Sequence, residues 1–460
     1  MIATEPVSPG SRMNSFMKAS GAQRALVRLR DLTNRADART TMSATVLRLA
    51  GAAAGFLSMR ISFRVLGVEG VAAVALVQAV SGWLFFIEAG TGMAAQNYVA
   101  KARSQGVPYS AGVSYLLRVP LYISLAVMPC IWFFSKLWLK ALGSGRAVPV
   151  ISQHGTAVVT AVTILVLQAA SSSMWRIYYA EGRGALGNLV QMSGSIVSCA
   201  AVWILSLSGV ESFAAYLLAL VTPGALLPLA FYCLRVIPQG ERVGGPIHAA
   251  PPSMNEVGSF FLFNLAAALA LRVDVLMLSR ASSSLQLATF VCMQRIMAIV
   301  MIWQISIQSA NQSQITVSWT SRDRPALWHL IKRMILTPIP AVLAAGIGLA
   351  LFDHKAALLL TSGKITSLGL GTIGAACIYY TLRIWTDAWS TVMLAVGDAR
   401  RLVLPTVVQG ALLIPMIYFL GRRFGSAGGY LALSAALCLT TCWWAPNSVI
   451  RGIRRLQSRL

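Results

Sequence analysis

The chain has 460 residues, of which 57% are hydrophobic and only 11% are charged, and its mean hydropathy is +0.68. A soluble domain carries about 25% charged residues, so this composition excludes an ordinary solvated surface and predicts an all-α polytopic membrane protein. The net charge of +24 would suggest nucleic-acid binding in a soluble protein. In a membrane protein, basic loops that fix the orientation of the helices explain it better.

Residues 1–40 are polar, basic and rich in serine, and we expect them to form a cytoplasmic tail. The apolar run that follows is long enough to stay in the membrane. This length argues against a signal peptide that is removed.

After this tail, runs of about 20 apolar residues predict twelve transmembrane helices in two six-helix halves around a central cavity. The first half covers residues 41–235 and the second covers 257–450; a linker rich in proline and glycine at 236–256 separates them, and a basic tail follows at 451–460. The expected spans are 43–65, 71–93, 113–134, 155–175, 186–207, 213–234, 257–278, 285–310, 333–352, 366–393, 402–421 and 427–447.

The loops on one side of this topology carry most of the lysines and arginines, and both termini lie on that side. By the positive-inside rule, this side is the cytoplasm. No loop is long enough to form a soluble catalytic domain, which argues against a membrane polymerase or ligase of glycans.

The first three spans contain isolated charged residues. Arg48 lies near the cytoplasmic end of its span, and we interpret it as a positive-inside residue. Arg60 lies deeper and one turn before Arg64, which can extend to the outer interface. Glu88 ends the second span, where an interfacial position costs little, and Arg118 lies in the third.

The seventh span carries Arg272 and Asp274. Residues two apart point to different faces of a helix, so these two side chains cannot pair well with each other. A buried aspartate of this kind is a candidate site for a coupling proton or sodium ion. A structural ion pair with an arginine of another span is the alternative.

The eighth span carries Arg295 and becomes polar in its second half, where Gln304, Gln308 and Gln312 recur every four residues. Lipid cannot satisfy an amide, so these side chains must face other helices or water. Hydrogen bonding to sugar hydroxyls is the functional interpretation, and hydrogen bonding between helices is the structural one.

The tenth span carries Arg383 and Asp387 one turn apart, a spacing that predicts an ion pair within the helix. An arginine at bilayer depth costs from about 3 kcal/mol upward. Unmatched arginines in several spans therefore predict a wet cavity that receives an anion. The arginines within the spans are Arg48, Arg60, Arg118, Arg272, Arg295 and Arg383, and the comparably placed acids are only Glu88, Asp274 and Asp387.

The sequence offers no pattern for metal binding or nucleophilic catalysis. All seven cysteines lie in apolar runs without a CxxC spacing, and we expect them to pack as small hydrophobic residues. We expect no cofactor apart from a coupling ion, H⁺ or Na⁺.

Three short motifs occur in a characteristic order: RVLGVEG at 64–70, IEAGTGMAAQ at 87–96 and RVDVLMLS at 272–279. This order resembles the polysaccharide flippases of the Wzx type, within the multidrug/oligosaccharidyl-lipid/polysaccharide exporter superfamily. The resemblance implies a protein of the bacterial inner membrane that moves an undecaprenyl-pyrophosphate-linked oligosaccharide to the periplasmic leaflet. It also implies a pathway for O-antigen, capsule or exopolysaccharide, with polymerase and chain-length proteins as partners beside membrane lipids, and no nucleic acid.

We therefore expect a flippase and not an enzyme, with two sets of functional residues. The anionic cargo would be held by Arg60, Arg118, Arg272 and Arg295, its sugars would contact Gln304 and Gln308, and Asp274 or Glu88 would bind the coupling ion. One alternative is a cation-coupled multidrug exporter of the same superfamily, in which acidic residues would dominate the cavity. The other is a membrane glycan polymerase or ligase.

Overall fold

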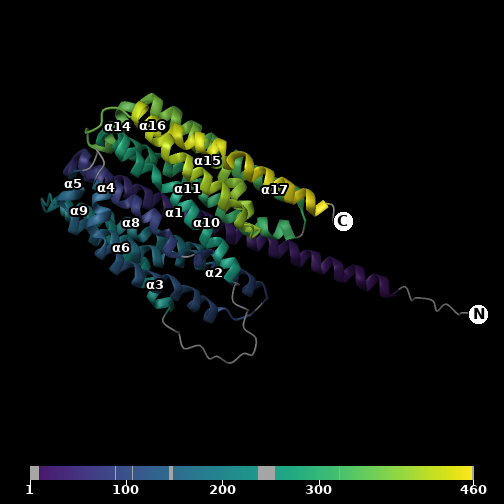
Figure 1. Ribbon diagram of the computed structural model, residues 1–460. Coiled ribbons are helices and arrows are strands. Elements are labelled where there is room, and N and C mark those ends of the chain that lie inside the picture. Colours follow the sequence, from purple (N-terminus) through teal and green to yellow (C-terminus); the bar gives the residue numbers. More distant parts are fainter. Residues whose placement is uncertain are drawn as a thin grey trace, which may run out of the picture.

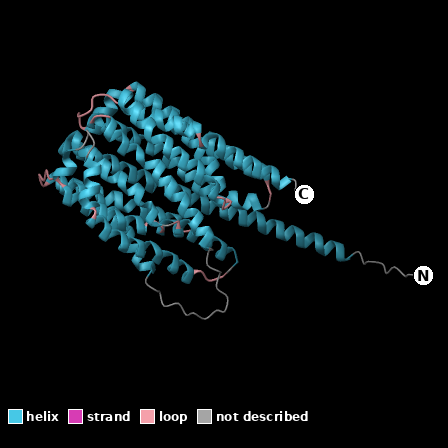
Figure 2. Cartoon of the chain, in the orientation of Figure 1, coloured by secondary structure: helices cyan, strands magenta, loops and turns pink. Residues whose placement is uncertain are grey.

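The computed structural model describes residues 10–88, 90–105, 107–143, 149–236, 254–320 and 322–457, with side chains from residue 46 onward apart from a few inside helices. The described residues form helices and no strand (Figure 2). The expected linker at 236–256 lies almost entirely outside the described residues.

The first half of the chain forms nine α-helices and one short 3₁₀ helix, η1. They are α1 (Gly10–Trp83), η1 (Leu84–Glu88), α2 (Thr91–Gln105), α3 (Ser110–Phe133), α4 (Ser135–Gly143), α5 (Pro149–Gln153), α6 (Gly155–Ser171), α7 (Met174–Ala180), α8 (Gly184–Leu207) and α9 (Phe213–Val236). The second half forms α10 (Met254–Ala281), α11 (Ser284–Thr320), α12 (Arg324–Leu336), α13 (Pro338–Leu351), α14 (Asp353–Thr361), α15 (Leu370–Ala395), α16 (Arg400–Leu439) and α17 (Thr441–Gln457).

The described residues contain nine helical stretches long and apolar enough to cross a membrane. The two longest, Val46–Glu88 and Arg400–Arg454, are each interrupted at a glycine. Gly67 has φ 67° and ψ −169°, and Gly425 has φ 59° and ψ −131°. Only glycine adopts such a conformation readily, so each residue joins two helices within one stretch. The polytopic helical fold is confirmed, whereas the number twelve stays a prediction.

The two halves lie side by side along the bundle (Figure 1). In Figure 1, α17 ends and α1 begins at the same end, and α4, α5 and α14 lie at the other. We call these the terminal end and the far end. Helix α1 packs on α8 within its own half and on α11 across the interface, and α10 packs most extensively on α16.

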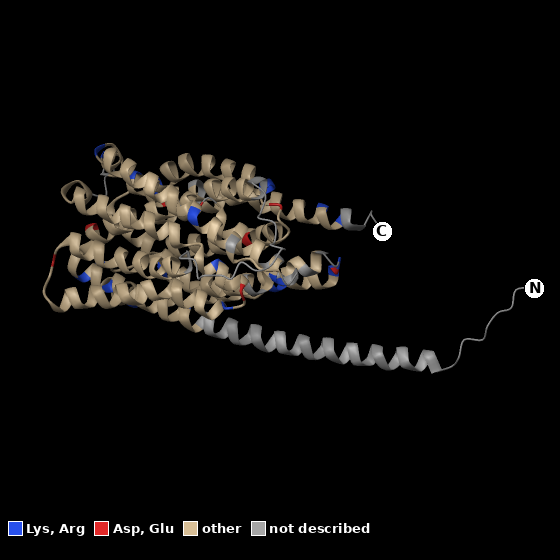
Figure 3. Ribbon diagram, turned by 90° about the horizontal axis from the view of Figure 1, so that it is seen from below, with Lys and Arg blue, Asp and Glu red and all other residues tan. Residues whose placement is uncertain are grey.

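Apolar residues fill the interface between the halves and also cover the outside of the bundle. The largest buried cluster joins Phe63 and Leu76 of the first half to Phe290 and Tyr430 of the second. Outside, large apolar side chains such as Phe133 are exposed, by 82% in this case. Figure 3 shows that most of the bundle carries no charged residue. Such a surface suits contact with lipid.

Candidate functional site

A cavity of about 530 Å³ lies between the two halves. Helices α1, α6, α8 and α9 line it from the first half, and α10, α11 and α15 line it from the second. Its volume lies within the usual range for ligand pockets. Its place at the interface of two helical halves is where transporters bind their cargo.

The two walls of this cavity differ in charge. Every side chain that the first half contributes is uncharged, whereas the second half contributes two arginines and one aspartate. The cavity therefore has a neutral polar wall opposite a charged wall. The polar residues of the first wall are Ser58, Ser62, Gln78, Ser81, Gln168, Ser195 and Ser198; the ionisable residues of the second are Asp274, Arg295 and Arg383.

The serines of the neutral wall lie on helical spacings that bring them to one face. Ser58 Oγ donates to the carbonyl of Ala54 and Ser62 Oγ to that of Ser58, both at 2.8 Å. A hydroxyl that donates within its own helix keeps lone pairs that can accept. This wall therefore presents acceptors to a ligand rich in hydroxyl groups. The four-residue spacing of Ser58 and Ser62 is the signal in the sequence for this shared face.

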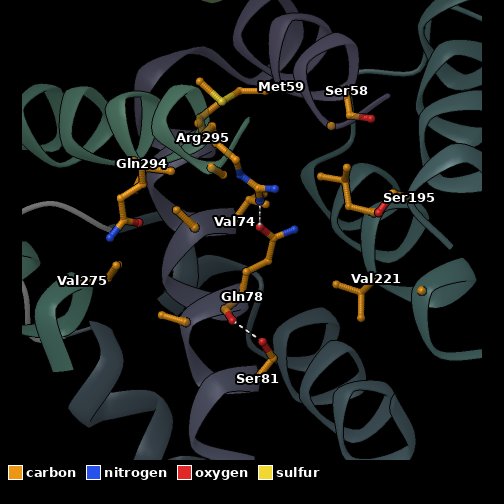
Figure 4. Close-up of a pocket in the computed structure, with 18 of the residues that line it drawn as sticks. Ser58, Met59, Val74, Gln78, Ser81, Ser195, Val221, Val275, Gln294 and Arg295 are labelled. Carbon is orange, nitrogen blue, oxygen red and sulfur yellow. Dashed lines mark hydrogen bonds between the residues drawn. The ribbon is translucent and has the colours of Figure 1, made fainter. Parts of the chain in front are cut away.

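Arg295 reaches across the cavity from α11 to α1. Its Nη2 donates to Gln78 Oε1 at 2.7 Å, and the guanidinium is exposed to the cavity. Figure 4 shows Arg295 and Gln78 pointing toward each other. A neutral amide satisfies a donor but does not neutralise its charge, so this hydrogen bond leaves Arg295 able to attract an anion.

Asp274 lines the charged wall from α10 and is only 3% exposed. Its Oδ2 accepts from Gln294 Nε2 at 2.9 Å, and its Oδ1 accepts from the backbone N–H of Val275 at 2.8 Å. The sequence predicted that Asp274 needs a partner from outside its own helix, and Gln294 of α11 is one.

Arg383 contributes the third ionisable group of the cavity. The predicted pair within α15 is confirmed, because Arg383 Nε lies 3.4 Å from Asp387 Oδ2. Arg383 Nη1 also donates to Tyr379 Oη at 2.9 Å. Its charge is thus partly offset inside its own helix.

Two other arginines expected to hold cargo do not line this cavity. Arg60 and Arg118 are exposed, on α1 and α3 respectively. The backbone carbonyl of Arg60 accepts a hydrogen bond from Ser362 Oγ at 3.1 Å, close to the far end. The side chain of Arg272 lies outside the described residues. Of the expected set, the structure places Arg295 and Asp274 together at the cavity.

The glutamine stripe of α11 turns away from the cavity. Gln304 follows Arg295 by nine residues, which places it about 180° around the helix. Ile307 and Ile315, close to Gln304 in angle, pack into a buried cluster within the second half. Gln304 is fully buried, and neither polar atom of its amide has a hydrogen-bond partner among the described residues; the same holds for Nε2 of Gln308. Contact of these glutamines with sugar stays a prediction, and neither Gln304 nor Gln308 lines the cavity.

The sequence suggested an interfacial position for Glu88, whereas the structure buries its side chain inside the protein. It is 1% exposed, and its Oε1 lies 3.3 Å from Arg176 Nε of α7. Gly92 makes room for it, since a Cβ at that position would lie 1.8 Å from Glu88 Oε1. The pair lies outside the cavity lining and joins η1 to α7.

The interpretation of Arg48 as a positive-inside residue was wrong. Its side chain is only 4% exposed. It donates to Asn188 Oδ1 at 2.9 Å, to Ser306 Oγ at 3.0 Å and to Tyr179 Oη at 2.9 Å. Asn188 and Ser306 lie on helices that carry several other polar residues, so the sequence alone did not single them out as partners of Arg48.

The chain is similar in sequence to one protein family and to one curated protein. Residues 48–200 match the MatE family. A protein of Yersinia pseudotuberculosis named "Putative O-antigen export protein" is 22% identical over 410 residues, which cover 87% of this chain and 93% of that protein. Both likenesses concern sequence, and the second extends over nearly the whole chain.

Solved transporter structures share the fold. An inward-facing multidrug resistance MATE family transporter of the MOP superfamily superimposes with a TM-score of 0.64 at 17% identity, covering 89% of this chain and 99% of that one. The lipid II flippase MurJ in an inward closed conformation gives a TM-score of 0.65 at 13% identity, covering 89% and 88%. Residues 48–200 of the chain therefore resemble the MatE family, and the chain as a whole shares the helical fold of these solved transporters.

Proposed function

We propose that this protein is a flippase that moves an undecaprenyl-pyrophosphate-linked oligosaccharide across the bacterial inner membrane, from the cytoplasmic to the periplasmic leaflet. The two halves would alternate in exposing the central cavity to either side. The oligosaccharide would serve the assembly of a surface polysaccharide such as O-antigen, capsule or exopolysaccharide.

The observation that carries this proposal is the division of the cavity into two walls. A lipid-linked oligosaccharide has an anionic pyrophosphate joined to a chain of hydroxyl-bearing sugars. Arg295 on the charged wall suits the pyrophosphate, since guanidinium groups bind phosphate oxygens through charge-assisted hydrogen bonds. The serine and glutamine side chains of the opposite wall suit the sugars. The relative named for O-antigen export supports the same class of cargo.

A second candidate, a multidrug exporter, is favoured by Asp274 and by the likeness to MATE transporters. A cationic drug would need this carboxylate as its partner, and Arg295 and Arg383 on the same wall would repel it. The flippase is therefore the better match to the cavity. A resistance assay in an exporter-deficient host separates the two, because only the second candidate raises resistance to cationic drugs.

Export in cells tests the proposal. In a host that lacks the chromosomal gene, plasmid-borne Arg295→Ala is expected to reduce surface polysaccharide at least tenfold and to accumulate lipid-linked oligosaccharide, because a charge-assisted hydrogen bond contributes about 1.5–3 kcal/mol. Arg295→Lys keeps the charge and is expected to restore part of the export.

Arg64→Ala is the matched control, since Arg64 is an exposed arginine on α1 that does not line the cavity. It is expected to export normally. Full export by Arg295→Ala at the parental protein level would refute the role of the cavity.

A further inference from the structure

Arg48 lies between the cavity and the terminal end of the bundle. On α1, the cavity lining begins at Gly55 and continues toward Gly67, so Arg48 precedes it. On α11, which runs in the opposite sense, the lining ends at Ala298, and Ser306 lies beyond it. The hydrogen bond between Arg48 and Ser306 therefore crosses the interface on the terminal-end side of the cavity.

The three partners of Arg48 divide between the halves. Tyr179 of α7 and Asn188 of α8 belong to the same half as Arg48, and they also bond each other at 2.6 Å. Ser306 of α11 belongs to the other half. Opening the terminal end would separate α1 from α11, so it breaks the Ser306 bond and leaves the other two intact.

The buried positive charge of Arg48 has no negative partner among the described residues. Arg48 is 4% exposed, and its partners among the described residues are all neutral. Neutral acceptors satisfy N–H groups without cancelling the buried charge, whose removal from water is costly. A guanidinium has five N–H groups, so further donors stay available once three partners are bound. An anion would complete the site.

The hydrogen bonds that cross the interface at the far end lie at exposed positions. Arg280 Nη2 donates to the carbonyl of Ala141 at 2.9 Å, and it joins α10 to α4 from an exposed position. The hydrogen bond from Ser362 to the carbonyl of Arg60 joins α1 to the segment after α14. The cavity thus lies between cross-interface contacts at both ends, and among these the contact of Arg48 at the terminal end involves a buried charge.

We propose that Arg48 is an anion-responsive latch: the phosphate of a lipid headgroup at the terminal end takes the Arg48 guanidinium from Ser306 and allows that end to open. The inference rests on the proposed function in one respect, alternating access. In the resting protein, Tyr179 and Asn188 hold Arg48 in place and Ser306 closes the interface. When a phosphate binds, it gives Arg48 a negative partner, which none of its described partners is. This new contact compensates for the lost Ser306 bond.

Cysteine accessibility tests the latch. In a full-length variant whose seven native cysteines are replaced by alanine, Ser195→Cys places one thiol on the cavity wall. A membrane-impermeant maleimide is applied to vesicles of both orientations, with a C-terminal tag to report which end faces the reagent. Ser306→Ala is expected to raise the labelling rate from the terminal end about tenfold, the effect of one hydrogen bond to a charged group. Arg48→Ala should act in the same direction.

Ser362→Ala is the matched control, since it removes a hydrogen bond across the interface at the far end and should leave the terminal-end labelling rate unchanged. Ser306→Ala is a small change that keeps the fold accessible to measurement even where Arg48→Ala is unstable. Labelling of Ser306→Ala at the parental rate would overturn the latch, and so would an equal rise in Ser362→Ala.

The response to anions is measured on the same vesicles with undecaprenyl pyrophosphate, inorganic pyrophosphate and undecaprenol. Undecaprenyl pyrophosphate is expected to raise terminal-end labelling of the protein with Arg48 and not of Arg48→Ala, and undecaprenol should do nothing. A rise with inorganic pyrophosphate alone would overturn the lipid headgroup as the source, and no rise with either pyrophosphate would overturn the anion response. Because these probes carry no sugar, the outcome is independent of whether an oligosaccharide is the cargo.

Discussion

At the scale of single residues, Asp274 is the carboxylate that the cavity lining contains. If it binds the coupling ion, Asp274→Asn should abolish transport driven by a pH or sodium gradient. The fold should be kept, since an asparagine oxygen can still accept the hydrogen bond from Gln294. The measurement compares gradient-driven transport with thermal stability in detergent; gradient-driven transport by Asp274→Asn at the parental rate would exclude the coupling role.

The buried pair of Glu88 and Arg176 gives a second prediction at this scale. Arg176→Met leaves a carboxylate that is 1% exposed without its partner, and we expect a loss of about 3–5 kcal/mol in stability. Adding Glu88→Gln removes the stranded charge and should recover most of that loss. Thermal denaturation of the two variants checks this. A double variant no more stable than the single one would show that the ion pair is not the source of the loss.

The same pair separates structure from coupling. If Glu88 serves only to join η1 to α7, the double variant should regain export together with stability. Stable protein without export would instead assign Glu88 a part in transport.

At the scale of helices, the neutral wall depends on the close approach of α8 and α9. A Cβ on Gly194 would lie 2.5 Å from Gly224 Cα and 3.3 Å from the carbonyl oxygen of Pro223. Gly194→Ala must push the two backbones apart, at a cost of about 1–3 kcal/mol, and should lower the melting temperature. Gly374→Ala in α15 is the matched control: nothing lies within 4 Å of its added Cβ, and alanine favours a helix. Equal effects of the two changes would contradict this packing.

How much the sequence predicts also becomes clear at the scale of helices. Apolar runs located most of the helices, and a spacing of one turn predicted the pair of Arg383 and Asp387. The sequence could not tell which face of a long helix meets the other half. For this reason Arg295 and Gln304 were grouped together, although they lie on opposite faces of α11. The burial of Arg48 could not be predicted, because it depends on partners 131 to 258 residues away in sequence.

At the scale of the whole molecule, a cavity lies between the two halves of the chain. Hydrogen bonds connect these halves at both ends of the bundle. In an alternating-access transporter, such contacts break in turn as each end opens. Under the proposed function, the charge difference between the cavity walls would have the second half hold the anionic part of the cargo while the first half contacts its sugars.

Reconstituted transport tests this account most directly. Liposomes containing the purified protein and an undecaprenyl-pyrophosphate-linked oligosaccharide are treated with an external reagent that cannot cross the bilayer and oxidises accessible glycan. The account predicts that the glycan of the inner leaflet, protected in protein-free liposomes, becomes accessible with the native protein and much more slowly with Arg295→Ala. Glycan that stays protected with the native protein, while the same vesicles transport a cationic drug, would contradict the account and identify the protein as a drug exporter.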